Sequence, residues 1–231
     1  MAGAIVNPHS FGAPISYEDE CKADSPLGLW MLDETSGTVA VDQGSVGQNG
    51  TYMNLPSLGT RTIFGLTSSL FNSSDVVIAT TPGLHTSYPG ATGTMSLEWI
   101  SHMDSATNFS FHVAWRQQPF QMYEQGGLIN FQGTGIAHNT GFASTVGVDQ
   151  HWVWTYDNAN QRAEVWLNGV SVNAVTSIPG SFGNWYTSSI ILGNMISQQG
   201  VYYALKGSMA GFALYSQVLS PARIAAHYAA L

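Results

Sequence analysis

The chain has 231 residues, which suits one large domain because all-β sandwiches commonly reach this size as a single unit. Hydrophobic residues make up 44% of the sequence and aromatic residues 12%, which excludes a disordered chain and provides for a sizeable core. Charged residues make up only 9%, against about a quarter in typical soluble domains. The polar surface must therefore consist of Ser, Thr, Asn, Gln and Gly, a composition that recurs in adhesins and virion proteins.

The formal net charge is −8, from 14 acidic and 6 basic residues, and so few basic residues cannot neutralise several phosphates. We therefore expect no nucleic-acid partner. The single cysteine, Cys21, cannot form an internal disulfide, which indicates folding in a reducing compartment. A nucleophilic role for Cys21 would need a base and an orienting group beside it.

The N-terminal segment has no positively charged region and no long apolar run, so it does not resemble a secretory signal. No stretch of the chain approaches the roughly 20 apolar residues of a membrane-spanning helix, and we expect no membrane insertion. Residues 1–24 contain Pro8, Pro14 and an acidic run, without sustained periodicity. We expect an extended N-terminal arm at residues 1–24, either a loose terminus or an arm that packs on a neighbouring subunit, and one domain at residues 25–231.

After the arm, apolar and polar residues alternate in many short stretches with the two-residue period of β-strands. Turn residues separate these stretches about every 8–12 residues. The predicted strands cover residues 27–32, 69–80 with a break at 72–74, 94–101, 109–113, 127–131, 188–193, 201–206 and 208–215, together with a central hairpin. A turn-rich loop at residues 33–54 and a polar connection at residues 114–126 lie between them.

The central hairpin is predicted at residues 151–172, which have a large aromatic content. Trp152 and Trp154 alternate with smaller residues in its first strand, and Glu164 and Trp166 alternate with aliphatic residues in its second. Asp and Asn residues form the turn between the strands, and an Asn-Gly pair that tolerates positive φ follows the second strand. We predict that the strand tryptophans belong to the core, namely Trp99, Trp152 and Trp154.

One convincing helix is predicted, at the C-terminus. Ser220 can cap it, Pro221 suits the first helical position, and residues 222–231 supply helix-forming residues. Roughly a dozen short strands with frequent turns indicate a β-sandwich or jelly roll.

Four segments, in this order along the chain, resemble the laminin-G-like jelly rolls of the concanavalin A-like lectin and glucanase superfamily. They are residues 27–52, residues 70–85 with 92–101, residues 151–172 and residues 191–231. The predicted fold is therefore all-β, an antiparallel β-sandwich (a concanavalin A-like jelly roll) with a short C-terminal helix and an extended N-terminal arm. The resemblance does not specify a function, because lectins, polysaccharide lyases, glycosidases and structural modules share this fold.

The acidic residues do not form the carboxylate pair that a glycosidase places across the scissile bond. Glu98 and Glu164 each stand alone on a predicted strand, and we expect both to face solvent. The sequence also lacks the metalloprotease, nucleophile-elbow and phosphate-loop motifs, and its seven His have no metal-ligand spacing. We therefore expect no enzymatic activity and no catalytic residue.

Calcium is the one candidate cofactor. Asp33, Asp42 and Asn49 lie in a single loop rich in oxygen ligands, which suits a hard cation such as calcium. The alternative is that the same residues only form turns.

Aromatic residues in the later loops suggest a ligand site, because aromatic rings stack on sugars while amides bind hydroxyl groups. The candidate ligand-binding residues are Trp185, Tyr186, Tyr202, Tyr203, Asn184, Asn194 and Gln198. Sugar binding, subunit contact and simple packing all remain open for these side chains.

Three functions are compatible with these features. The first is a non-enzymatic structural or adhesion protein of a virion, such as a bacteriophage minor tail or capsid-surface protein, made in the host cytoplasm without a signal peptide. Its arm would bind other virion subunits in an oligomer, and its lectin-like domain would contact host-surface glycans. The second is a free carbohydrate-binding module, and the third is a glycan-cleaving enzyme. The low charge, the single cysteine and the adhesion-type fold favour the first.

Overall fold

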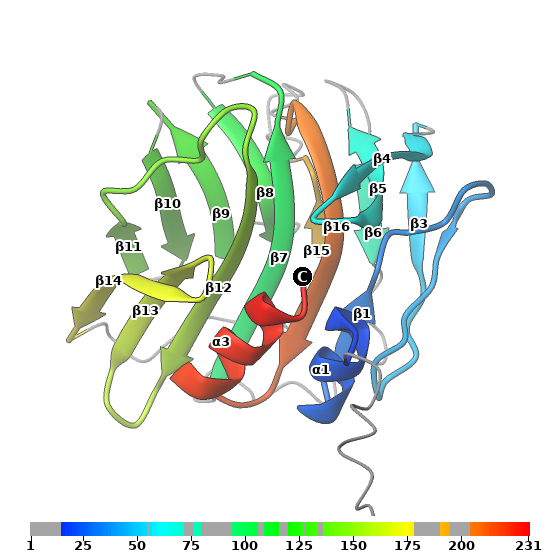
Figure 1. The fold of residues 1–231 in the computed structure, drawn as a ribbon. Helices are drawn as coiled ribbons and strands as arrows, with labels where there is room; N and C mark the ends of the chain where they lie inside the picture. Colours follow the sequence, from blue (N-terminus) through cyan, green and yellow to red (C-terminus); the bar gives the residue numbers. More distant parts are fainter. Residues whose placement is uncertain are drawn as a thin grey trace, which may run out of the picture.

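The computed structural model describes residues 15–54, 56–71, 76–79, 94–105, 109–115, 120–126, 128–133, 136–177, 190–194 and 204–231. These residues form two antiparallel sheets of eight strands each and two short helices (Figure 1). The helices are α1 (Tyr17–Ala23) and α3 (Pro221–Ala229). In the described part of the chain, neither helix has the length and apolar composition needed to cross a bilayer.

The first sheet has the strand order β14-β13-β12-β7-β16-β5-β4, and β1 pairs with β16. Its strands are β14 (Val170–Thr176), β13 (Arg162–Leu167), β12 (Asp149–Asp157), β7 (Met95–Met103), β16 (Gly207–Tyr215), β5 (Leu66–Phe71), β4 (Ser57–Ile63) and β1 (Gly28–Trp30). The second sheet has the order β11-β10-β9-β8-β15-β6-β3-β2. Its strands are β11 (Ile136–Asn139), β10 (Leu128–Gly133), β9 (Phe120–Gln125), β8 (Phe109–Trp115), β15 (Ile190–Leu192), β6 (Val76–Ala79), β3 (Gly50–Met53) and β2 (Val39–Ala40).

The first sheet is buried on both faces at its centre. On β7, Leu97 and Trp99 belong to the core between the two sheets, whereas Ile100 belongs to a second apolar cluster with residues of α1 and α3. Alternate residues of a strand point to opposite faces, so the second cluster lies on the outer face of this sheet. Figure 1 shows α3 crossing in front of β12, β7 and β16, with α1 beside β1. The predicted all-β sandwich with a C-terminal helix is confirmed, and the helices add a third layer.

The central hairpin is confirmed. β12 pairs with β13 in a register that places Trp154 opposite Val165. Asn168 and Gly169 have φ angles of 50° and 77°, as a tight turn from β13 into β14 requires. The core prediction is also confirmed, because three tryptophans have no exposed surface, namely Trp99, Trp152 and Trp154. Trp99 and Trp152 stack with their ring centroids 6.1 Å apart.

The structure differs from the expected N-terminal arm at its second half. Ser16 caps α1 by accepting a hydrogen bond from the Asp19 amide at 3.1 Å, and acidic residues fill the first turn. Tyr17 and Cys21 of this helix are buried against the first sheet. A seven-residue helix is too short to produce a clear apolar period, which is why the sequence indicated an extended segment. Residues 1–14 lie outside the described residues.

Two other strand predictions need comment. The polar connection expected at residues 114–126 contains a strand, β9, whose Gln121 and Glu124 are buried. These buried polar residues made a strand look like a loop. Of the strand expected at residues 201–206, only 204–206 are described, and they contain an isolated bridge rather than a strand. The predicted break at 72–74 also lies outside the described residues.

We expect Trp152→Ala to lower the free energy of unfolding by about 3–5 kcal/mol, the range for deleting a large buried aromatic side chain. Chemical denaturation of both proteins measures this difference. Val170→Ala, at a position 65% exposed on β14, is the control and should leave the denaturation midpoint unchanged. An unchanged midpoint for Trp152→Ala would contradict the core assignment.

Candidate functional site

Glu98 on β7 is fully buried beneath the two helices, so the expectation that it faces solvent is wrong. Its side chain points to the outer face of the first sheet, as expected for a strand residue next to the core residues Leu97 and Trp99. The sequence could not show that α1 and α3 cover this face.

Four side chains from four different elements contact the Glu98 carboxylate. The Tyr17 hydroxyl donates to Oε1 at 3.1 Å and the Tyr215 hydroxyl donates to Oε2 at 3.0 Å. His151 Nε2 lies 2.6 Å from Oε1, and His227 Nδ1 lies 2.9 Å from Oε2. Burial alone would raise the pKa of Glu98, but the hydrogen bonds and charges of the two histidines hold this pKa far below its ordinary value. The buried carboxylate therefore stays ionised.

His227 lies between two carboxylates. Its Nδ1 contacts Glu98, and its Nε2 lies 2.8 Å from Asp24 Oδ2, so each ring nitrogen faces a carboxylate, which favours the imidazolium form. Burial alone would lower the pKa of His227. The hydrogen bonds and charges of Glu98 and Asp24 nevertheless raise this pKa above its ordinary value. They do so although the guanidinium of Arg223 is close, with Nη2 3.5 Å from His227 Nε2. Arg223 also contacts Asp24 at 2.8 Å and Glu20 at 2.6 Å. These contacts join the end of α1 to α3.

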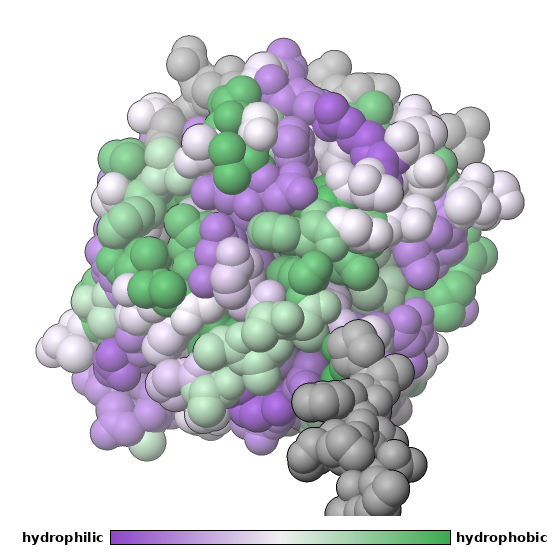
Figure 2. All heavy atoms as spheres, in the orientation of Figure 1, coloured by the Kyte–Doolittle hydropathy of each residue, from purple (hydrophilic) through white to green (hydrophobic). Residues whose placement is uncertain are grey.

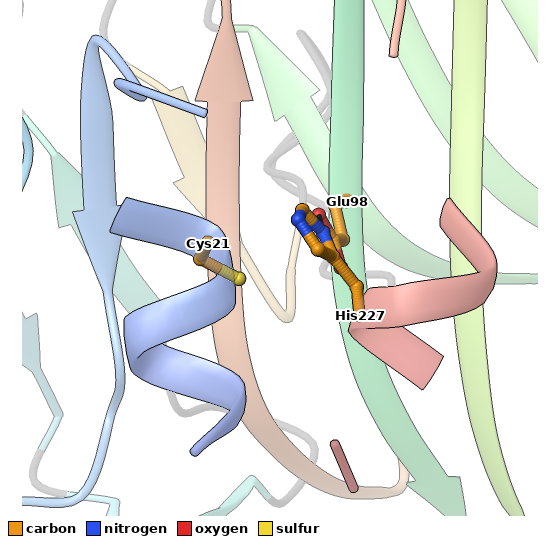
Figure 3. A group of neighbouring side chains, drawn as sticks. All are labelled: Cys21, Glu98 and His227. Atoms are coloured by element: carbon orange, nitrogen blue, oxygen red, sulfur yellow. Dashed lines mark hydrogen bonds and ion pairs between the residues drawn. The ribbon is translucent and has the colours of Figure 1, made fainter. Parts of the chain in front are cut away.

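Three side chains of this region could in principle hold a metal ion. Ligand atoms of Cys21, Glu98 and His227 lie within 4.8 Å of one another, and Figure 3 shows the Cys21 side chain on α1 near the paired Glu98 and His227. Both nitrogens of His227 already face carboxylates, however, which leaves no lone pair for a metal. Burial also raises the pKa of the Cys21 thiol, which disfavours the thiolate that a metal would need. The arrangement is that of a structural ionic cluster, which we call the Glu98 cluster.

A second site opens on the same face of the first sheet. A cavity of about 270 Å³ lies between β12, β13 and the residues that lead into α3. Its lining residues are Thr155, Asp157, Arg162, Glu164, Trp166, Val218, Leu219, Ser220 and Pro221. Arg162, Glu164 and Trp166 are alternate residues of one strand, so they share a face. We call this cavity the Trp166 pocket.

The Trp166 pocket combines an aromatic ring with two acids and one base. Arg162 Nη2 lies 2.8 Å from Glu164 Oε2, and the Ser171 hydroxyl donates to Glu164 Oε1. The Glu164 side chain is only 12% exposed, so the expectation that it faces solvent freely is also wrong. Hydrogen bonds from Asn160 and the charge of Arg162 lower the pKa of Asp157. Figure 2 shows hydrophobic and hydrophilic residues interspersed over this face of the molecule.

Two of the three residues proposed for calcium, Asp42 and Asn49, accept backbone hydrogen bonds with their side-chain oxygens. Asp42 Oδ1 accepts the amides of Leu29 and Gly44 at 2.8 Å, and its Oδ2 accepts the Gln48 amide at 2.6 Å. Asn49 Oδ1 accepts the Asp42 amide at 2.9 Å. Asp33 is exposed as a residue, but partial desolvation of its carboxyl group and the charge of Glu34 raise its pKa. This geometry favours the turn alternative, and calcium binding stays a prediction.

Most of the loop residues proposed for ligand binding lie outside the described residues. Six of the seven residues lie outside the described part of the chain, namely Asn184, Trp185, Tyr186, Gln198, Tyr202 and Tyr203. Asn194 is described and fully buried, which does not suit a side chain that binds a ligand from solvent. The sequence contained one signal for the Trp166 pocket, namely that Glu164 and Trp166 alternate with the core residue Val165 and so share a face.

No protein-family model matches the sequence, and no curated protein matches it either. The fold, in contrast, is similar to that of solved structures. A structure of botulinum neurotoxin type C, described by its dependence on two ganglioside molecules for cell entry, has a TM-score of 0.68 at 12% identity and matches 89% of this chain and 51% of its own. The binding domain of botulinum neurotoxin serotype D has a TM-score of 0.66 at 13% identity, over 91% of this chain and 52% of its own.

A third similar structure is the Trypanosoma rangeli sialidase in complex with sialic acid. Its TM-score is 0.60 at 12% identity, and it matches 88% of this chain and 32% of its own. The chain has a concanavalin A-like fold. It spans about half of the neurotoxin chains and about a third of the sialidase chain. At these identities the likeness concerns the fold alone.

We expect Glu98→Gln to lower the free energy of unfolding by about 3–5 kcal/mol, because it keeps the packing but removes the buried charge that His151 and His227 both contact. Denaturant unfolding near neutral pH measures the loss. The matched control is Glu18→Gln, which removes a surface carboxylate on α1 and should cost less than about 1 kcal/mol. Equal stability of the two variants would show that the Glu98 cluster does not hold the helices.

The raised pKa of His227 predicts a pH dependence of stability. Its contribution is fully present below the ordinary histidine pKa of 6.5 and is lost as the pH rises through the raised pKa of the folded state. Wild type should therefore lose stability above pH 6.5, whereas His227→Gln should be less stable below that pH and lack this decline. Denaturation curves recorded over a pH series test this. Parallel pH profiles for the two proteins would rule it out.

Proposed function

We propose that this chain is a non-enzymatic, lectin-like module that binds a glycan in the Trp166 pocket. The observation that carries the proposal is the combination of Trp166 with the charged side chains of Asp157, Arg162 and Glu164 in one cavity. An indole can stack on the apolar face of a sugar ring, and planar carboxylate and guanidinium groups can bind adjacent hydroxyl groups through paired hydrogen bonds. Pockets of this kind, with apolar walls and a few convergent polar groups, are typical of small-molecule sites.

The pocket is built on rigid elements, which favours binding. Asp157 and Trp166 stand on the paired strands β12 and β13, and the wall at residues 218–221 is anchored to β7. Ser96 Oγ on β7 donates to the Gln217 carbonyl at 2.8 Å and accepts the Leu219 amide at 2.9 Å. Side chains held in place before binding lose less conformational entropy when a ligand arrives.

The similar structures support a glycan ligand at the level of the fold. The neurotoxin type C structure is described through its ganglioside molecules, and the sialidase structure contains sialic acid. Because one fold can carry unrelated functions, this likeness adds to the pocket chemistry and cannot replace it.

The pocket chemistry favours binding over cleavage. A glycosidase needs one carboxylic acid with a raised pKa to protonate the leaving group. In the Trp166 pocket the pKa of Asp157 is lowered, and Glu164 is held by Arg162 and Ser171. We therefore propose a module without catalytic activity, and turnover of a polysaccharide panel would count against it.

We expect Trp166→Ala to remove most of the glycan affinity while the protein remains folded, because the variant lacks the aromatic wall of the pocket. Glycan-array binding followed by titration of any hit measures the loss, which should be at least about tenfold, or about 1.4 kcal/mol. Phe142→Ala is the matched control, since Phe142 is a 40% exposed aromatic outside the pocket lining. Equal binding by the two variants would exclude the Trp166 pocket as the site.

We propose further that the module is displayed on a virion, as a bacteriophage minor tail or capsid-surface protein made in the host cytoplasm. Support comes from the sequence: the low content of charged residues, the single cysteine and an N-terminal segment rich in Pro and Gly that could bind another subunit in an oligomer. Immunoblotting of purified particles distinguishes this location from a free carbohydrate-binding module.

The structure sharpens the test of the N-terminal segment. Deleting residues 1–14 should leave the sandwich folded and abolish incorporation into particles, because α1 with its buried Tyr17 and Cys21 is retained. Deleting residues 1–24 should also destabilise the fold, since Tyr17 and Asp24 belong to the Glu98 cluster. Circular dichroism and particle purification separate the two effects. Normal assembly of the shorter deletion would refute a docking role for residues 1–14.

A further inference from the structure

We infer that the Trp166 pocket selects a single sugar residue that is neutral or carries an amino group, and that it rejects acidic sugars such as sialic acid. This inference rests on the proposed function and adds the chemical class of the ligand. The inferred ligand differs from the sialic acid that is bound in the similar sialidase structure.

The charges that line the pocket are the first reason. Two carboxylates, Asp157 and Glu164, face one guanidinium, Arg162. Arg162 pairs with Glu164 at 2.8 Å and stands opposite Asp157 in the register of the hairpin. Both acidic side chains therefore interact with the same guanidinium. The carboxylate of an acidic sugar would have to compete with Asp157 and Glu164 for Arg162.

The other basic side chains of the described residues do not offset the excess negative charge of the pocket. Arg223 follows the pocket wall in sequence, but it is engaged by Asp24 and Glu20 on the side of α1. Lys22, Arg61 and Lys206 do not line the pocket. The net charge of −8 adds a long-range repulsion of anionic ligands. An amino sugar would meet the opposite situation, because its ammonium can form charge-assisted hydrogen bonds with Asp157 or Glu164.

The size of the cavity is the second reason. Its volume of about 270 Å³ lies below the roughly 300–1,000 Å³ of pockets for drug-sized ligands. One pyranose ring suits this volume, whereas the long glycerol and carboxylate substituents of a sialic acid add bulk as well as charge. The preferred ligand is thus one neutral or amino-substituted ring, such as the terminal residue of a longer glycan.

The experiment is a titration of the full chain with four small glycosides, in which calorimetry or ligand-observed NMR measures binding. The probes are methyl galactoside, methyl 2-amino-2-deoxyglucoside, methyl glucuronide and methyl N-acetylneuraminate. The two non-acidic sugars should bind at least about tenfold more tightly than the two acids, a difference of about 1.4 kcal/mol. The neutral and amino sugars should both lose binding in Trp166→Ala.

Two charge variants test the cause. Asp157→Asn and Glu164→Gln keep the shape of the side chains and remove one negative charge each, so the discrimination against glucuronide should shrink several-fold. Glu18→Gln removes the same charge from the surface of α1 and should leave the discrimination unchanged. If charge repulsion is the cause, both pocket variants differ from this control.

The outcomes separate the inference from the proposed function. Binding of an acidic sugar as tightly as the neutral ones, with loss of binding in Trp166→Ala, would overturn the inference and leave the glycan site standing. An unchanged preference for non-acidic over acidic sugars in both Asp157→Asn and Glu164→Gln would also overturn the inference. Failure of all four sugars and of a broad glycan array to bind would overturn the proposed function together with the inference.

Discussion

The outer layer of this protein depends on one buried carboxylate. Glu98 receives contacts from Tyr17 on α1, His151 on β12, Tyr215 on β16 and His227 on α3. A lone carboxylate in this position would be strongly unfavourable, because removal from water costs several kcal/mol. Two of its four partners, Tyr17 and His227, reach it only when the helices are docked. Glu98 therefore makes the docking of the first and the last described helix interdependent.

The helix that His227 attaches to β7 also borders the Trp166 pocket. His227 holds α3 against β7, and the residues that lead into α3 form one wall of the cavity. Leu219 is buried and bonded to Ser96 on the strand that carries Glu98. The ionic cluster and the pocket wall are thus both attached to β7, at Glu98 and at Ser96.

Much of the fold could be predicted from the sequence, because it is encoded locally. The two-residue period located β7, the central hairpin and β16, and the Ser-Pro pair located α3. Periodicity assigned Glu98 and Glu164 to the face opposite the core. It could not say what covers that face, because the covering helices lie more than 50 residues away in the sequence, at Tyr17–Ala23 and Pro221–Ala229. For that reason Glu98 looked like a surface residue.

The candidate site escaped prediction for a related reason. Sequence patterns favour ligand sites in loops at the ends of a sandwich, where aromatic residues stand next to turn residues. The Trp166 pocket lies instead on a sheet face, between the hairpin and residues 218–221 of the segment that leads into α3. Its charges are set by the register that brings Arg162 opposite Asp157 and beside Glu164. Similar folds therefore do not imply similar ligands, because the ligand is chosen by side chains that each sequence places on the shared scaffold.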